Sequence, residues 1–183
     1  MLETEIKLPI PKEEPIEAKL LACGFASGAS VREEDTYFAP SGNVPTEAGF
    51  ALRIRQVTDL ATGNRQSLIT YKGQRQSEDA MVRRELETGL GDANTMREIL
   101  LALGYQPLPV RVKKERHVLT RGPVNACVDA VAGLGRFLEL EIILPDGAAP
   151  QEALATIDAI LASLGHGREE TVTTSYLKQL LAK

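Results

Sequence analysis

Charged side chains recur at every second position along several short segments of the chain. Glu3, Glu5 and Lys7 alternate with apolar or small residues, and Arg53 and Arg55 do the same. Since successive side chains of a β-strand point to opposite faces, this period of two places each charged set on one face of a strand. Carboxylates arranged in this way can bind divalent cations, and arginine or lysine can bind phosphate.

The charged positions divide into an acidic set and a basic set. Oxygen ligands suit hard cations such as Mg²⁺ and Mn²⁺, and both histidines lie outside the pattern, so zinc is not favoured. The candidate metal ligands are Glu3, Glu5, Glu85, Glu87, Asp129, Glu139 and Glu141. The candidate phosphate ligands are Lys7, Arg53, Arg55, Lys72, Arg83, Lys114 and Arg116. Together they have the composition of a polyphosphate site.

These residues lie on segments that have the patterns of strands, and short turns such as Thr62-Gly63-Asn64 favour antiparallel pairing. The predicted strands are 2–8, 31–38, 50–57, 66–73, 82–88, 110–119, 125–132 and 136–144. Helical spacing of apolar residues predicts helices over 13–23, 93–103, 150–164 and about 174–182. The first three of these end at a glycine, which is typical of a helix C-terminus.

Two interpretations fit the charged strand faces. One is a sheet with a solvated face, which usually includes Thr, Ser and Gln. The other is a closed barrel with its charged face inward, and this is favoured because the positions are nearly all charged and of both signs. About eight strands enclose room for side chains or one small ligand. We therefore expect an α+β protein: a closed eight-stranded antiparallel β-barrel with helices packed outside.

One predicted strand fits this scheme less well. Lys114 and Arg116 share a face with Val110 and Val112 if the strand is regular. A β-bulge or a bend would separate the charged residues from the valines, but the sequence pattern of this segment does not indicate one.

An ordered series of motifs resembles the CYTH superfamily, the triphosphate tunnel metalloenzymes. The segment Glu3-Thr4-Glu5-Ile6-Lys7 resembles its N-terminal ExExK signature. Further resembling segments are 35–38, 51–55, 70–73, 83–87, 112–116, 133–141 and 175–177. The resemblance runs along nearly the whole chain and implies a single domain over residues 1–183.

The resemblance implies a triphosphate-bearing substrate and catalytic Mg²⁺ or Mn²⁺. One metal would be held by Glu3, Glu5 and either Glu139 or Glu141, and a second by Asp129, Glu85 or Glu87. The basic set would orient the phosphates. The residues given catalytic roles on this basis are Glu5, Glu87 and Lys72.

Three activities remain open after this resemblance. The favoured activity is divalent-metal-dependent hydrolysis of inorganic, nucleoside or thiamine triphosphate. The alternative is a class IV adenylyl cyclase, which converts ATP to cyclic AMP and pyrophosphate. Those cyclases carry a His-Phe pair shortly before ExExK, whereas Met1 and Leu2 precede Glu3 here. The third is a non-catalytic protein that binds a phosphorylated ligand.

Composition narrows the classes of partner. The formal net charge is −4, which argues against nucleic acid as a partner. Cys23 and Cys127 are too few and too far apart for a disulfide framework. No stretch approaches the about 18 apolar residues of a membrane span, and the acidic N-terminus is unlike a signal peptide. We expect a cytoplasmic protein with no membrane partner, and the resemblance makes a homodimer possible.

Overall fold

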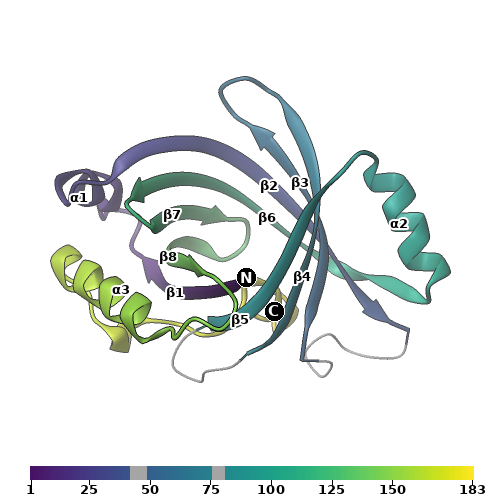
Figure 1. Cartoon of the computed structure of the whole chain (residues 1–183). Coiled ribbons are helices and arrows are strands. Elements are labelled where there is room, and N and C mark those ends of the chain that lie inside the picture. Colours follow the sequence, from purple (N-terminus) through teal and green to yellow (C-terminus); the bar gives the residue numbers. More distant parts are fainter. Residues whose placement is uncertain (42–48, 76–80) are drawn as a thin grey trace.

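The computed structural model describes residues 1–41, 49–75 and 81–183, except for the side chains of Arg75 and Met81. Strands of these residues form a closed antiparallel barrel in the order β1-β5-β4-β3-β2-β6-β7-β8 (Figure 1). The strands are β1 (Leu2–Ile10), β2 (Ala26–Pro40), β3 (Ala51–Asp59), β4 (Arg65–Arg75), β5 (Met81–Leu90), β6 (Tyr105–Arg121), β7 (Val124–Val131) and β8 (Gly135–Leu144). The predicted eight-stranded barrel is confirmed.

Strands β2 and β6 are longer than the sequence pattern predicted. They span 15 and 17 residues and pair with each other along most of their lengths. The first residues of β2, Ala26–Ser30, are exposed, so they lack the apolar alternation by which a half-buried strand is recognised. The long pairing of β2 with β6 connects two parts of the barrel. One part contains β1 and β3 to β5, and the other contains β6 to β8.

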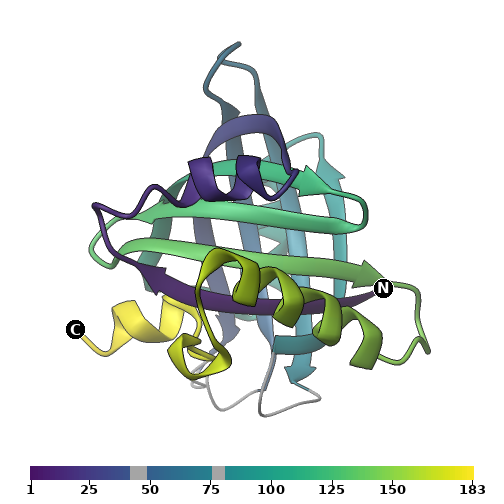
Figure 2. The same cartoon turned by 90° about the vertical axis from the view of Figure 1, so that its left-hand side faces the viewer.

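Two helices cover the outer face of the barrel over β1, β7 and β8, as Figure 2 shows. They are α1 (Ile16–Ala22) and α3 (Gln151–Leu164). Ile157 of α3 and Leu20 of α1 are fully buried in one core with outward side chains such as Leu138. This core holds the strands that carry most of the acidic residues. Helix α1 starts later than predicted, directly after Pro15.

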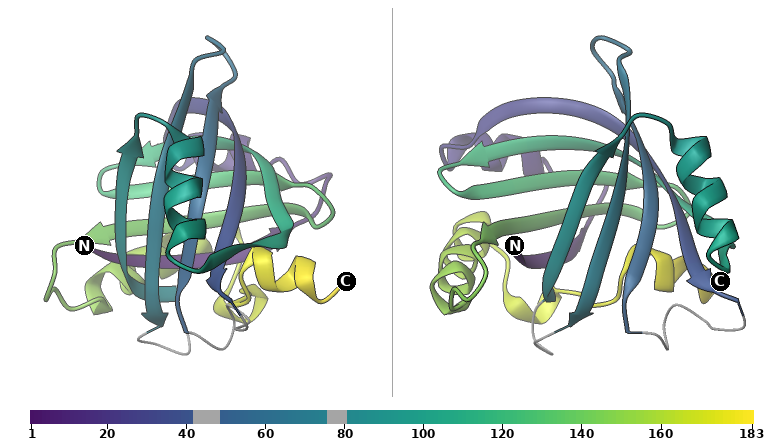
Figure 3. Two further views of the ribbon diagram at one scale, coloured as in Figure 1. Left: turned by 90° about the vertical axis from the view of Figure 1, so that its right-hand side faces the viewer. Right: turned by 45° about the vertical axis from the view of Figure 1, so that its right-hand side comes forward.

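Helix α2 (Ala93–Ala102) lies across the outside of the opposite wall (Figure 3). Its Leu100 packs with Phe38 of β2 and Ile54 of β3. Asp92 caps the helix, since its side chain accepts a hydrogen bond from the backbone N–H of Asn94. Helix α2 thereby buries the part of the outward face of β2 and β3 around Phe38 and Ile54, and the alternate residues Asp35, Arg53 and Arg55 face inward.

The last helix, α4 (Tyr176–Leu181), follows a short 3₁₀ turn, η1 (Arg168–Glu170), and packs differently from the others. Tyr176 and Leu177 form a cluster with Val112, Val131 and Phe137. The last three lie on strand positions that share a face with the charged residues. One end of the barrel interior is therefore apolar and is covered by α4.

In the structure β6 shifts its register against β2 at two places, between Leu119 and His117 and between Arg111 and Pro107, but not between the charged residues and Val112. The pairing of β6 with β2 runs without a break from Arg116, opposite Val31, to Arg111, opposite Thr36. Val112, Lys114 and Arg116 consequently share the inward face. The valine belongs there because it meets α4, while the two cations lie deeper among carboxylates.

No helix of the described residues is both long enough and apolar enough to span a lipid bilayer.

Candidate metal and phosphate site in the barrel

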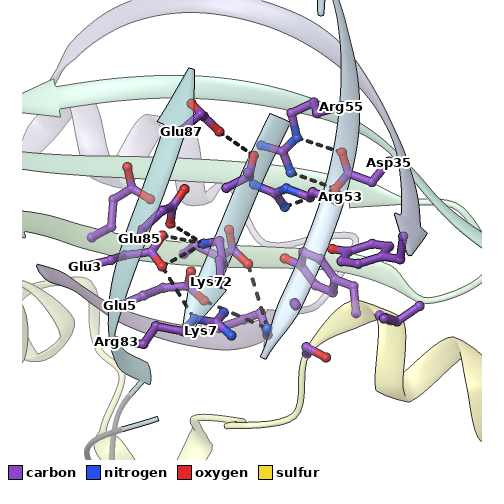
Figure 4. A pocket seen from close by; sticks show the side chains of 18 of the residues that line it. Glu3, Glu5, Lys7, Asp35, Arg53, Arg55, Lys72, Arg83, Glu85 and Glu87 are labelled. Carbon is purple, nitrogen blue, oxygen red and sulfur yellow. Dashed lines mark hydrogen bonds and ion pairs between the residues drawn. The ribbon is translucent and has the colours of Figure 1, made fainter. Parts of the chain in front are cut away.

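The barrel encloses a cavity of about 260 Å³. Charged side chains of β1 to β6 and β8 line it, together with the N-terminal end of α4 (Figure 4). Every residue that the sequence proposed as a metal or phosphate ligand lines this cavity except Asp129. Residues separated by more than a hundred positions in the chain are thus gathered in one compartment.

Three carboxylates form a compact group at one side of the cavity. Glu3, Glu5 and Glu141 each offer a ligand oxygen, and these oxygens lie within 4.8 Å of one another. Strand register explains the proximity, because Glu5 of β1 lies directly opposite Glu141 of β8. Asn125 donates a hydrogen bond of 3.0 Å to Glu141 and so restrains its orientation.

The carboxylate group fits a hard divalent cation. Glu5 is only 4% exposed, and its Oε1 has no hydrogen-bond partner among the described residues. Burial raises the pKa of Glu5 to about 7, and the neighbouring charge of Glu139 adds to the effect. The Lys7 ammonium lies 4.0 Å from the Oε1 of Glu5. A buried oxygen without a hydrogen-bond partner, next to two further carboxylates, is an environment that a bound cation would stabilise.

Lys72 of β4 supplies the positive charge nearest to this group. Its ammonium lies 2.7 and 2.6 Å from the two carboxylate oxygens of Glu3 and 2.7 Å from Glu85. Burial alone would raise the pKa of Glu3, but the charge of Lys72, the hydrogen bonds with Glu85 and Lys72 and the charge of Arg83 together outweigh burial and hold that pKa at about 2. Glu3 is therefore ionised and already neutralised by a buried lysine.

Arg53 and Arg55 of β3 bind a carboxylate that the sequence analysis did not assign. Asp35 of β2 accepts one hydrogen bond of 3.1 Å from Arg53 and two, of 2.7 and 2.8 Å, from Arg55. Burial opposes ionisation of Asp35, yet the two guanidinium groups hold its pKa below the usual range. Buried Glu33, two residues earlier on the same face, lies 2.9 Å from Arg55 and was missed as well. Glu33 lies two positions before Asp35, and this strand periodicity could have identified it in the sequence.

Lys114 and Arg116 of β6 bind the remaining buried acids. Asp129 lies 2.9 Å from the Lys114 ammonium and accepts two hydrogen bonds of 2.6 Å from Arg116. Arg116 also contacts Glu139. Burial would raise the pKa of Glu139, but Lys114 and Arg116 hold it well below the usual range. Both acids are therefore held by cations in this structure.

Tyr176 is a functional candidate for which the sequence analysis proposed no role, although it noted the motif Ser175-Tyr176-Leu177. The Tyr176 hydroxyl donates a hydrogen bond of 3.1 Å to Asp129. The ammonium of Lys7 lies 4.4 Å from the centre of its ring, and that of Lys114 lies 5.4 Å away. Helix α4 thus positions two cations and one acid of the site.

The remaining predicted residues lie toward the edge of the cavity. Glu87 is exposed and accepts a hydrogen bond of 2.7 Å from the Thr70 hydroxyl. The Arg83 Nε lies 3.7 Å from Glu3. The described residues hold one group of three acidic ligands within 4.8 Å, Glu3 with Glu5 and Glu141. The second set implied by the resemblance, Asp129 with Glu85 or Glu87, does not form such a group here and stays a prediction.

Comparison with known proteins places this architecture in a family. The family model of the CYTH domain matches residues 1–176. The chain belongs to the CYTH domain family. The family resemblance that the sequence motifs indicated is therefore confirmed.

Relatives of this CYTH protein match it along nearly the whole chain. "Putative adenylate cyclase MJ0240" of Methanocaldococcus jannaschii is 32% identical over 178 residues, which are 97% of this chain and 98% of the relative. The structure of PH1819 protein from Pyrococcus horikoshii OT3 has a TM-score of 0.87 at 28% identity and covers 98% of each chain.

A plant protein shares the fold at lower identity. HpAC1 from Hippeastrum, described as having a dominant triphosphatase activity, has a TM-score of 0.68 at 14% identity. The match covers 99% of this chain and 95% of the plant protein. At that identity the likeness extends to the fold alone.

Proposed function

We propose that this CYTH protein is a divalent-metal-dependent hydrolase of triphosphate substrates. The observation that carries the proposal is the composition of the cavity. A group of three carboxylates that suits one divalent cation lies among buried lysine and arginine side chains that suit a chain of phosphates.

The cations are arranged to hold several phosphate groups at once. Arg53 and Arg55 present guanidinium groups from one wall, and Lys114 and Arg116 present their charges from another. A triphosphate with about four negative charges would take over part of the neutralisation that buried acids now provide. Because Arg55 and Arg116 each bind an aspartate in a forked arrangement, they are preformed for oxyanions.

The reaction would be the attack of water on the terminal phosphorus with loss of orthophosphate. A divalent cation held by Glu3, Glu5 and Glu141 would neutralise charge on the phosphate oxygens as the transition state forms. Lys72 would orient the phosphate next to that group. Glu87 lies at the cavity edge, where it can reach water, and would accept the proton of the attacking water.

Two features support hydrolysis at the end of a phosphate chain over cyclisation of a nucleotide. The cavity of about 260 Å³ is smaller than the roughly 300–1,000 Å³ of pockets that enclose drug-sized ligands. Its aromatic lining among the described residues consists of Tyr37 and Tyr176. Tyr176 is already covered by Lys7 and Lys114, so it does not offer a free face to a nucleobase.

Adenylyl cyclase activity is the second candidate, because a relative that is 32% identical bears that name. In that reaction the ribose 3′-hydroxyl would attack the α-phosphorus of ATP, and pyrophosphate would leave. The same cavity would then have to hold the phosphate chain with the sugar next to the carboxylate group.

A product assay separates the two candidates. The protein is incubated with inorganic triphosphate or with ATP in the presence of Mg²⁺ or Mn²⁺, and the products are resolved by phosphorus NMR. We expect release of orthophosphate, above all from inorganic triphosphate. Pyrophosphate together with cyclic AMP would overturn the proposal in favour of the cyclase.

Matched variants connect the product assay to the site. Glu5→Gln removes a charge from the carboxylate group and should abolish metal-dependent turnover. Glu98→Ala changes an exposed glutamate on α2, outside the barrel, and should leave turnover unchanged. Equal rates for Glu5→Gln and the unmodified protein would refute the metal-binding role.

A further inference from the structure

Lys72 forms an ion pair with a carboxylate that a bound metal would need as a ligand. Its ammonium contacts both oxygens of Glu3, and Glu3 is one of the three residues of the carboxylate group. Figure 4 shows Lys72 between Glu3 and Glu85, with Arg83 approaching Glu3 from the other side. In this structure Glu3 therefore has an internal counter-ion before any metal binds.

The two uses of Glu3 oppose each other. A divalent cation bound to Glu3 would lie close to the Lys72 ammonium, and the two positive charges would repel each other in a buried site.

A triphosphate removes the conflict, because it offers Lys72 another anion. Lys72 lines the cavity with Arg53 and Arg83, so phosphate oxygens held by these guanidinium groups come within reach of its ammonium. Movement of the ammonium from Glu3 to a phosphate would leave Glu3 free for the metal. Linkage requires the reciprocal effect: metal bound at Glu3 would release Lys72 for phosphate.

We propose that Lys72 is an exchangeable counter-ion that couples the binding of metal and triphosphate through Glu3. In the metal-free site Glu3 is then held in ion pairs with Lys72 and Arg83, and the site takes up metal tightly only when a phosphate chain is present. This inference rests on the proposed function for the identity of the anion, and its test requires no turnover.

The test is a titration of the protein with Mn²⁺ alone at pH 8, followed by the electron paramagnetic resonance signal of free Mn²⁺. Lys72→Met removes the ammonium that contacts both oxygens of Glu3 and also pairs with Glu85, and Glu3 keeps Arg83, at 3.7 Å, as a counter-ion. We expect Lys72→Met to bind Mn²⁺ about tenfold more tightly or better, since couplings between sites commonly amount to 5- to 150-fold.

Lys114→Met is the matched control. It removes the same charge from the same cavity, but Lys114 pairs with Glu33, Asp129 and Glu139, none of which belongs to the group of Glu3, Glu5 and Glu141. We expect its Mn²⁺ affinity to change by less than about threefold. An affinity of Lys72→Met no higher than that of Lys114→Met would overturn the proposal.

A second titration tests the coupling directly. A methylene-bridged triphosphate, which resists hydrolysis, is added at saturation before Mn²⁺. Chelation of Mn²⁺ by this analogue is common to all variants, so a difference between them reports the protein. The gain in Mn²⁺ affinity that the analogue produces should be at least fivefold smaller in Lys72→Met than in the unmodified protein. An equal gain in both would refute the coupling.

Two further measurements keep the test decisive. Lys72→Gln is prepared in parallel in case the methionine variant does not fold, with circular dichroism as the check. Without phosphate, Mn²⁺ should raise the melting temperature of the Lys72 variants more than that of the unmodified protein. A protein that hydrolyses no triphosphate but shows these shifts would contradict the proposed function alone. Normal hydrolysis without these shifts would contradict the counter-ion proposal alone.

Discussion

Glu5→Gln should stabilise the metal-free protein at alkaline pH while it abolishes activity. The Glu5 carboxyl ionises near pH 4.5 in the unfolded chain, but burial and the charge of Glu139 raise its pKa to about 7 in the folded protein. Below pH 4.5 the carboxyl is neutral in both states. Above pH 7 it is ionised in both, and the folded protein then holds a buried charge that it disfavours.

The size of the effect follows from that difference in pKa. Each unit corresponds to about 1.4 kcal/mol, so the interval from 4.5 to about 7 amounts to roughly 3 kcal/mol. The contribution of Glu5 to stability is fully present below pH 4.5 and is lost as the pH rises through 7. Glutamine has nearly the same shape and does not titrate, so its contribution stays constant.

The assay is urea unfolding in the presence of EDTA at several pH values between 4.5 and 8. The free energy of unfolding of Glu5→Gln minus that of the unmodified protein should increase by roughly 3 kcal/mol across this range. Mg²⁺ in excess over EDTA at pH 8, added together with the methylene-bridged triphosphate, should reduce the difference, because a bound cation offsets the charge of Glu5 in the unmodified protein. A difference that does not vary with pH would refute the reasoning, since it would mean that Glu5 ionises normally in the barrel.

Three further predictions test other parts of the structure. Arg53→Ala should raise KM for inorganic triphosphate about tenfold or more, with a smaller change in kcat, because one charged hydrogen bond is worth about 1.5–3 kcal/mol. An unchanged KM in steady-state kinetics would contradict a contact between Arg53 and phosphate. Tyr176→Phe should lower the free energy of unfolding, measured by urea denaturation, by about 1 kcal/mol, because buried Asp129 loses the hydrogen bond that the Tyr176 hydroxyl donates. Equal unfolding midpoints would show that this hydrogen bond does not contribute to stability. Burial opposes protonation of His166, but its hydrogen bonds with Glu170 and Glu14 together outweigh this effect and raise the pKa of His166. The stabilisation by His166 is therefore present below pH 6.5 and is lost as the pH rises through the folded pKa. His166→Gln should remove this decline, and identical pH profiles of melting temperature would refute it.

The barrel and the inward face of most strands were predictable because strand periodicity is a local property. Glu3, Glu5 and Lys7 alternate with Leu2, Thr4 and Ile6 whatever the rest of the chain does. The same rule placed Val112 on the inward face correctly, but it gave no reason for an apolar residue among the charged ones. Its partners on α4 lie more than sixty positions later in the chain, and no local pattern indicates that α4 covers an end of the barrel.

The sequence by itself determined which side chains share a compartment and which ligands suit it, because residue type and alternation set charge and direction along each strand. Only the tertiary structure decided which acid meets which cation. Lys72 reaches Glu3 across 69 positions because β5 lies between β4 and β1 in the closed barrel. Glu5 faces Glu141 because β8 closes the barrel against β1. Strand order and register bring the outward apolar side chains of β1, β7 and β8 under α1 and α3, and those of β2 and β3 under α2, so they depend on contacts that no single segment contains.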